Sequence, residues 1–167
     1  MIILENRLTE VFDQLPEIDG FKPVFDFGNQ FHLDALLKRY SENNTCIYPL
    51  VYLDITEYEE DHEQFGLEMT TDIKLIVACQ NTDTTLLNKN RWAMSYDKVL
   101  FPMTENIKTA MLRANIFNWD GHFKIKKYPN YGNGDENKQI DIWDALTIRI
   151  SNVIVTDDCV NEINFNY

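Results

Sequence analysis

Two strand-like runs organise this chain: Cys46-Ile-Tyr-Pro-Leu-Val-Tyr-Leu-Asp-Ile55 and Leu67-Glu-Met-Thr-Thr-Asp-Ile-Lys-Leu-Ile-Val-Ala-Cys-Gln80. The first run is rich in β-branched and aromatic residues, and its length suits one strand better than a helix. The second run alternates apolar and polar residues up to Asp72 and is then almost continuously apolar. Such a change is typical of a strand that is half solvated at one end and buried at the other. We therefore predict a hairpin at the centre of a sheet.

The segment that joins these two runs is strongly acidic. It reads Thr56-Glu-Tyr-Glu-Glu-Asp-His-Glu-Gln-Phe65 and is too charged to enter a core. Its carboxylates suit a hard cation, but the segment lacks the glycine-punctuated alternation of a calcium loop. We expect a solvated loop, and the functional alternative is an exposed arm that grips a neighbouring molecule.

Two helices and an edge strand are expected before the hairpin. Apolar residues recur at helical spacing from Ile3 to Leu15, and Pro16 ends that helix. The stretch from Phe21 to Phe27 alternates in the manner of a short strand at a sheet edge. Asn29 then suits the N-cap of a helix that runs to about Tyr40. In that helix Phe31, Ala35 and Leu36 are expected to share an apolar face, which Leu33, Leu37 and Tyr40 flank.

A long helical region and further strands are expected after the hairpin. The helical pattern runs from Leu86 to Ala114, and Pro102 inside it predicts either two helices that meet just before the proline or one kinked helix. The segment from His122 to Tyr128 alternates, with lysines on one face. A second alternating strand is predicted from Ile140 to Ile150, and residues 152–156 continue it beyond a bulge.

This order of elements predicts the fold class. Hairpins in place of βαβ alternation indicate an α+β fold, with a mostly antiparallel sheet and two to four helices packed on it. The length of 167 residues fits a single domain that spans positions 1–167.

Charge and composition bound the function. The net charge is −12, and the sequence scatters its lysines and arginines, which argues against a nucleic-acid-binding surface. An acidic surface favours solubility, and it also suits a protein that DNA passes without sticking. No signal peptide and no run of about 20 apolar residues is present, so we expect a soluble protein made in a cytoplasm. Cys46, Cys79 and Cys159 are expected to be buried small hydrophobes in a reducing compartment.

No pattern of catalytic or metal-binding residues emerges from the sequence. His32, His62 and His122 are not at metal-ligand spacing, and no serine has a GxSxG context. Asp141 and Asp144 fall on opposite faces of the predicted strand and do not converge, so we expect solvated or turn carboxylates. We accordingly predict no catalytic residue, no cofactor and no metal, and a protein that is not an enzyme.

Residues suited to contacts between proteins are more numerous. They come from the acidic segment, from the aromatic loop after residue 128, and from the C-terminal tail, whose alternation would let it add a strand to a neighbouring chain or to its own sheet. The predicted interface residues are Glu57, Tyr58, Glu59, Glu60, Asp61, His62, Tyr128, Tyr131, Phe165 and Tyr167.

The whole order of elements resembles the tail terminator, or tail-completion, proteins of tailed bacteriophages. The resemblance covers about Met1 to Leu112 and, more loosely, Asp141-Ile-Trp-Asp144. It is carried by an N-terminal amphipathic helix and by the segments Lys22-Pro-Val-Phe25, Tyr48-Pro-Leu-Val-Tyr-Leu53, Ile73-Lys-Leu-Ile-Val-Ala78 and Val99-Leu-Phe-Pro-Met103, the last reached through a helix that contains Arg91.

The resemblance implies a structural role in the virion. It implies a tail-terminator-like α+β subunit, made in the bacterial host cytoplasm, that forms a homo-oligomeric ring, typically of six copies. Such a ring caps the tail tube, joins it to the head-completion or connector proteins, and leaves a lumen through which DNA passes without specific binding. Two alternatives stay open: another neck component, such as a head-closure or connector protein, and a cytoplasmic enzyme with an unrecognised pocket. A convergent cluster of titratable groups in a deep cleft would favour the enzyme.

Overall fold

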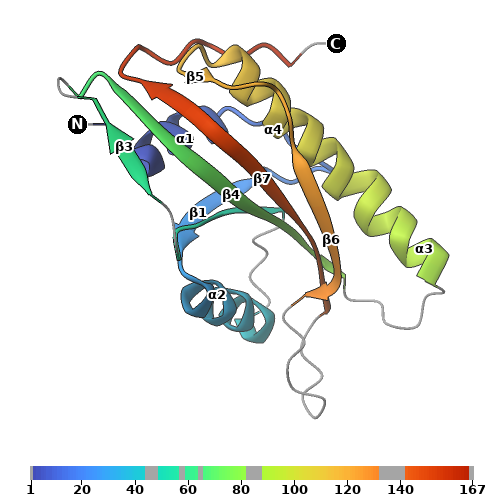
Figure 1. The fold of residues 1–167 in the computed structure, drawn as a ribbon. Helices are drawn as coiled ribbons and strands as arrows, with labels where there is room; N and C mark the ends of the chain where they lie inside the picture. The colour runs from blue at the N-terminus through green and yellow to red at the C-terminus, as the bar shows by residue number, and fades with distance from the viewer. Residues whose placement is uncertain are drawn as a thin grey trace.

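The computed structural model describes residues 2–43, 49–56, 59–63, 66–81, 88–131 and 142–165. Its architecture is α+β, with helices packed on a mixed sheet (Figure 1). In chain order the elements are α1 (Leu4–Phe12), β1 (Val24–Gly28), α2 (Gln30–Asn43), β2 (Leu50–Asp54), β3 (Glu60–His62), β4 (Glu68–Asn81), α3 (Asn88–Trp92), the π-helix η1 (Ala93–Leu100), α4 (Phe101–Arg113), β5 (Phe117–Asn118), β6 (Lys124–Tyr131) and β7 (Ile142–Thr156).

The predicted central hairpin is confirmed. The strand order is β1-β2-β4-β7-β5, with β3 also paired to β4 and β6 also paired to β7. Strands β2 and β4 pair antiparallel, with Leu50 opposite Ala78 and Leu53 opposite Leu75. The pair β1–β2 is parallel and every other pair is antiparallel, so the sheet is mostly antiparallel as predicted.

Strands β4 and β7 form the long centre of the sheet. They pair from Glu68 opposite Thr156 to Asn81 opposite Ile142. The predicted bulge is present, because β7 has one more residue than β4 between two successive pairs of this ladder. At the bulge Asn152 has a φ of 55°, and its backbone N–H donates to Asp72 Oδ1 at 2.8 Å. Asparagine tolerates this left-handed conformation better than most residues, so it suits the position.

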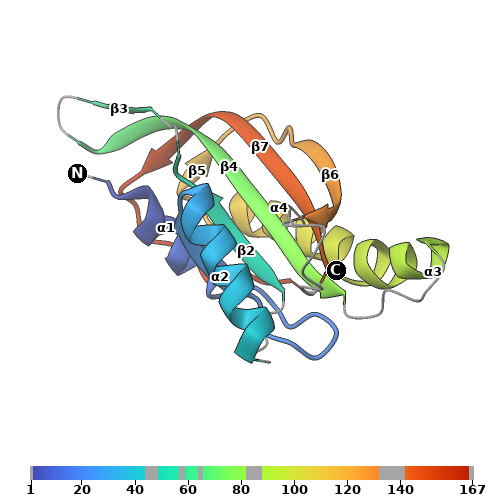
Figure 2. The same ribbon diagram turned by 90° about the horizontal axis from the view of Figure 1, so that it is seen from below.

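Helices cover the two faces of the sheet unequally. One face packs against α1, η1 and α4 in the larger core, to which Leu75 and Leu146 contribute from β4 and β7. The other face packs against α2 in a smaller core that includes Leu33 and Ile76. Figures 1 and 2 show α2 alone on its side, near β1 and β2. Much of β4, β7 and β6 is therefore left without a helix on that face.

The predicted apolar face of α2 is correct only in part. The predicted flanking residues Leu33 and Leu37 are buried and Leu36 is partly buried, whereas Phe31 is 83% exposed and Ala35 is also exposed. The sheet beneath the helix decides which residues of α2 are buried. Asn29 caps the helix as predicted, since its Oδ1 accepts a hydrogen bond from the His32 backbone N–H at 2.9 Å.

The long helical region is continuous across the predicted break. The element boundary falls between Leu100 and Phe101, as expected, with Pro102 in the first turn of α4. The sequence pattern did not predict the π-helix before this boundary, in which Tyr96 O accepts a hydrogen bond from the Phe101 N–H five residues on. This wider π-helical turn ends just before Pro102, whose backbone nitrogen has no hydrogen to donate.

The described part of the C-terminal tail packs on its own chain and forms no strand there. Asn161 N–H donates to Ala114 O at 3.2 Å, and Ile163 N–H donates to Gln14 Oε1 at 2.8 Å. Ile163 is buried, and Phe165 is partly buried against the larger core. The tail therefore closes the layer formed by α1 and α4.

Candidate functional site

An acidic arm stands at one corner of the sheet. We define it as residues 59–63 and 66–71, which contain β3 and the start of β4; Figure 2 shows these strands extending outward from the corner. The acidic segment is thus not only the predicted solvated loop, because Glu60 pairs with Thr71 and His62 pairs with Met69. Backbone pairing holds β3 in place while Glu60 and Asp61 stay exposed, which explains how so charged a segment joins a sheet.

The arm carries charge of one sign. Within its described residues there is no lysine or arginine, and the carboxylates are those of Glu59, Glu60, Asp61, Glu63 and Glu68. Hydrogen bonds within the arm fix its shape, among them those from Thr71 Oγ1 to Glu59 O at 2.8 Å and from Glu63 N–H to Glu68 O at 3.1 Å. Between described residues of the arm, His62 Nε2 forms an ion pair with Glu60 Oε2 at 2.9 Å. Among the described residues β3 pairs with β4 alone, so its outer backbone edge is open.

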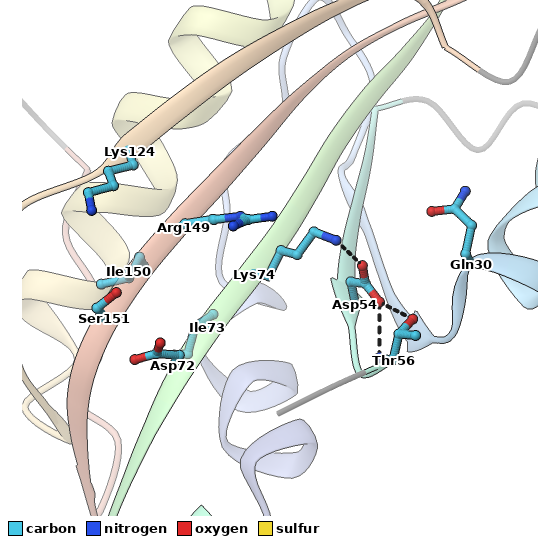
Figure 3. Close-up of a pocket in the computed structure, with 10 residues that line it drawn as sticks. All are labelled: Gln30, Asp54, Thr56, Asp72, Ile73, Lys74, Lys124, Arg149, Ile150 and Ser151. Atoms are coloured by element: carbon cyan, nitrogen blue, oxygen red, sulfur yellow. Dashed lines mark hydrogen bonds and ion pairs between the residues drawn. The ribbon is translucent and has the colours of Figure 1, made fainter. Parts of the chain in front are cut away.

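A basic strip crosses the part of the sheet that α2 leaves uncovered. Register places Lys74 of β4 opposite Arg149 of β7, and Arg149 opposite Lys124 of β6. Residues in register point to the same face, so the three cations form a row, and Lys126 shares their face two residues along β6. We call these four residues the basic strip. The row lines a hollow of about 570 Å³ that Thr56 and Ser151 also border (Figure 3).

Two carboxylates in this hollow are already engaged. Asp54 is nearly buried; it is paired with Lys74 Nζ and accepts hydrogen bonds from Thr56 N–H at 3.0 Å and Thr56 Oγ1 at 2.5 Å (Figure 3). Burial disfavours the charged form of Asp54, but the hydrogen bonds from Lys74 and Thr56 outweigh it and lower the pKa of this carboxyl. Asp72 accepts the Asn152 N–H described above. Within the described residues Arg149, Lys124 and Lys126 form no ion pair.

Tyr128 lies at the end of the strip. Lys126 Nζ is 4.9 Å from the centroid of its ring. A hydrogen bond from Lys126 is the main reason that the pKa of Tyr128 is lowered. Of the other residues predicted at an interface, Glu59, Glu60, Asp61 and His62 come together in the arm. Glu57, Tyr58 and Tyr167 lie outside the described residues, and so does the side chain of Tyr131.

Two sequence predictions about single residues were wrong. Asp144 was expected to be solvated or in a turn, yet it is 1% exposed, because alternation along β7 places it on the same face as Leu146, toward the larger core. Cys159 was expected to be buried but is exposed after the end of β7, whereas Cys79 is buried as predicted. Cys46 lies outside the described residues.

The hollow is suited to holding anions better than to acid–base chemistry. A carboxylate with a lowered pKa and three hydrogen-bond donors, like that of Asp54, is a weak general base. Guanidinium and ammonium groups in a row present donors that match carboxylate oxygens. In the part of the chain that the structure describes, no three His, Cys, Asp or Glu side chains are grouped to hold a metal ion.

The strip was not predicted from the sequence. Lys74, Lys124 and Arg149 come together through the pairing register of three strands, which no local sequence pattern reveals. The lysines on one face of β6 were the only signal.

Among the described helices none is long and apolar enough to cross a bilayer. No protein-family model matches this sequence, and no curated protein resembles it significantly.

Proposed function

We propose that this protein is a structural subunit of a tailed-bacteriophage virion that assembles into a ring at the neck. The ring caps the tail tube and joins it to the head-completion or connector proteins, while DNA passes through its lumen. The observation that carries the proposal is the acidic arm, an exposed edge strand with carboxylates and no lysine or arginine among its described residues. The arm is suited to binding another protein molecule.

Edge strands and like charges explain why the arm needs a neighbour. An open strand edge exposes unpaired N–H and C=O groups, and charged side chains on such an edge oppose unspecific pairing. Carboxylates packed closely on one hairpin repel each other, and a cationic partner relieves that repulsion. A projecting arm on one copy and a different receiving surface on the next make a heterologous contact, which closes into a ring when the rotation between copies is right.

The net charge of −12 supports the same role. A lumen lined by an acidic protein repels the phosphate backbone, so DNA slides through without being held. The arm would serve a head-closure or connector protein of the same neck equally well. The partner that the ring binds separates these two positions.

Negative-stain electron microscopy tests the proposal. The purified protein is imaged over a range of concentrations, alone and mixed with tail tubes from a lysate of the phage that encodes it. We expect rings, or caps at one end of each tube. Protein that remains monomeric at every concentration and leaves tube ends bare would overturn the proposal. Caps on the head connector in place of tube ends would move the protein to the head-closure position.

A neutralised arm tests whether the arm carries assembly. The variant Glu59→Gln/Glu60→Gln/Asp61→Asn keeps the size of each side chain and removes three charges. We expect it to fold as a monomer and to form fewer rings and caps than the unchanged protein. Its matched control removes the same number of charges from exposed carboxylates away from the arm: Asp97→Asn, Glu105→Gln and Glu162→Gln. Equal assembly of the two variants would show that the arm plays no special part.

A further inference from the structure

We infer that the basic strip of one copy is the receptor for the acidic arm of the next copy. This inference rests on the proposed ring and adds to it the two surfaces that meet. Both surfaces belong to this chain, so the partner is a second copy. The arm supplies carboxylates, and the strip supplies the cations of Lys124, Lys126 and Arg149 that have no ion-pair partner among the described residues.

The strip is an unfavourable arrangement in an isolated molecule. Like charges directly opposite each other on neighbouring strands destabilise a sheet, and here Lys74, Arg149 and Lys124 are opposite one another across three strands. Among the described residues of the chain, only Lys74 of the row has an ion-pair partner, Asp54. The chain has 27 acidic residues against 15 basic ones, so a row of cations goes against its composition. An anionic partner accounts for such a row.

Within one molecule the carboxylates of β3 do not reach Lys124 and Lys126, because two strands of the sheet lie between β3 and β6. Strand β3 pairs with one edge of β4, while β7 and then β6 follow on the other edge. Neighbouring strands lie about 4.8 Å apart, so three strand spacings of about 14 Å in total separate β3 from β6. Figure 1 shows these two strands on opposite sides of the sheet. Contact between copies satisfies both charges where contact within one copy does not.

The two different surfaces also give the contact its direction. Because the arm and the strip are different surfaces, two copies joined by one contact keep a free arm on one copy and a free strip on the other. Such head-to-tail contacts continue from copy to copy until the rotation closes them.

Charge reversal at each surface tests this pairing. The strip variant is Lys124→Glu/Lys126→Glu, and the arm variant is Glu60→Lys/Asp61→Lys. Each exposed ion pair strengthens association by up to about fivefold, and reversal adds repulsion, so each variant should self-associate at least about 30-fold more weakly than the unchanged protein. Sedimentation velocity measures this constant.

A one-to-one mixture of the two variants is the decisive sample. The strip variant keeps the acidic arm and carries two carboxylates in its strip, and the arm variant carries two lysines in its arm and keeps the cationic strip. In the mixture the unchanged arm meets the unchanged strip and the introduced lysines meet the introduced carboxylates, so alternating rings should form at close to the unchanged affinity. The control Lys89→Glu/Lys98→Glu makes the same change of charge on exposed lysines of α3 and η1 and should assemble normally.

The outcomes separate this inference from the proposed function. Rings from the unchanged protein, together with undiminished self-association of the strip variant, would overturn the pairing and leave the ring standing. A mixture that stays as dissociated as its components would also overturn the pairing. An unchanged protein that forms neither rings nor caps would overturn both proposals. If circular dichroism shows that a reversal unfolds the chain, Lys124→Gln/Lys126→Gln replaces it, with a smaller loss of about fivefold expected.

A zero-length crosslink gives an independent readout. Carbodiimide joins carboxylates to lysines in direct contact, and a mixture of ¹⁵N-labelled and unlabelled protein distinguishes crosslinks between copies from those within one copy. We expect mixed-isotope peptides that join the arm at Glu60 or Asp61 to Lys124 or Lys126. Crosslinks between copies confined to other surfaces would contradict the pairing.

Discussion

Gly28→Ala should destabilise the protein far more than an ordinary glycine substitution. Gly28 ends β1 with a φ of 156°, and a Cβ there would lie 2.3 Å from Tyr52 Oη and 2.8 Å from His32 Nδ1. Tyr52 is fully buried, so its ring cannot move out of the way cheaply. Its hydroxyl donates to Asn29 O at 3.2 Å and is 2.8 Å from His32 Nδ1.

The magnitude follows from these contacts. An unfavourable backbone conformation costs about 1–3 kcal/mol. Each of the two hydrogen bonds of the displaced hydroxyl contributes about 1 kcal/mol. We therefore expect Gly28→Ala to lower the free energy of unfolding by about 4 kcal/mol, within a range of about 3–5.

A double-mutant cycle isolates the clash. Tyr52→Phe removes the hydroxyl that the new Cβ meets, together with both of its hydrogen bonds, and should cost about 2 kcal/mol by itself. In that background Gly28→Ala should cost about 1–2 kcal/mol less, because the next obstacle is the exposed side chain of His32, which can turn away. The assay is equilibrium unfolding in urea, followed by circular dichroism.

Gly20→Ala is the matched control. Gly20 also has a positive φ, of 81°, but no atom lies within 4 Å of the added Cβ. Its substitution should cost about 1 kcal/mol, from backbone strain alone. Equal losses for the two alanine variants, or strict additivity of Gly28→Ala with Tyr52→Phe, would refute the packing argument at the end of β1.

Three further predictions concern the sheet and the arm. Ile76→Asp should abolish folding, because an unpaired charge at this buried position costs several kcal/mol, which is about the whole stability of a domain. A soluble variant with a native circular dichroism spectrum would show that β4 is not central. Asp54→Asn should lower the free energy of unfolding by about 1–3 kcal/mol at pH 7. We expect a loss in the lower part of this range, because solvent around Lys74 screens its attraction to Asp54. Folding lowers the pKa of Asp54 from 3.8, so its contribution is complete above that pH and is lost as the pH falls through the lower pKa of the folded state. The urea melts of the two proteins should therefore converge at acid pH, and a gap that does not narrow as the pH falls below 3.8 would contradict the ion pair. Deletion of Glu57 to Gln64 should leave a folded monomer whose stability falls by about 1 kcal/mol but whose assembly on tail tubes is weakened; a large loss in the thermal midpoint of the monomer would count against a role in assembly.

The elements that sequence predicted are those with a local signature. Alternation marked β4 and β7 because each presents one face to a core, and the bulge at Asn152 was visible as a break in that alternation. Asn29 marked the start of α2 because its side chain caps the helix within three residues. Pro102 fixed the boundary at residue 101 because it lacks a donor. In each case the cause lies within a few residues of its effect.

The features that sequence missed depend on distant partners. Strand β3 is formed by pairing with β4, and nothing in Glu60–His62 itself favours a strand. The rotation of α2 was ambiguous because the choice between Phe31 and Leu33 depends on the sheet beneath the helix. Asp144 was placed on the correct face of its strand, but that face is covered by a helical layer that the alternation does not reveal.

The basic strip illustrates why net charge is a weak guide to local charge. Lys74, Lys124 and Arg149 are separated in sequence by 50 and 25 residues, so any window along the chain finds them scattered. Sheet register, set by burial of the opposite face, aligns them because their neighbours Ile73, Ile148 and Ile150 must face the core. The pairing of β4 also places the arm at its other edge, because β3 and β7 pair with opposite edges of β4. Burial of the core therefore determines the positions of both the acidic arm and the basic strip. Because Asp54 and Asp72 flank the strip and the rest of the chain is acidic, long polyanions meet repulsion on either side of it. A short acidic hairpin meets less of this repulsion than a long polyanion, and the chain carries such a hairpin itself.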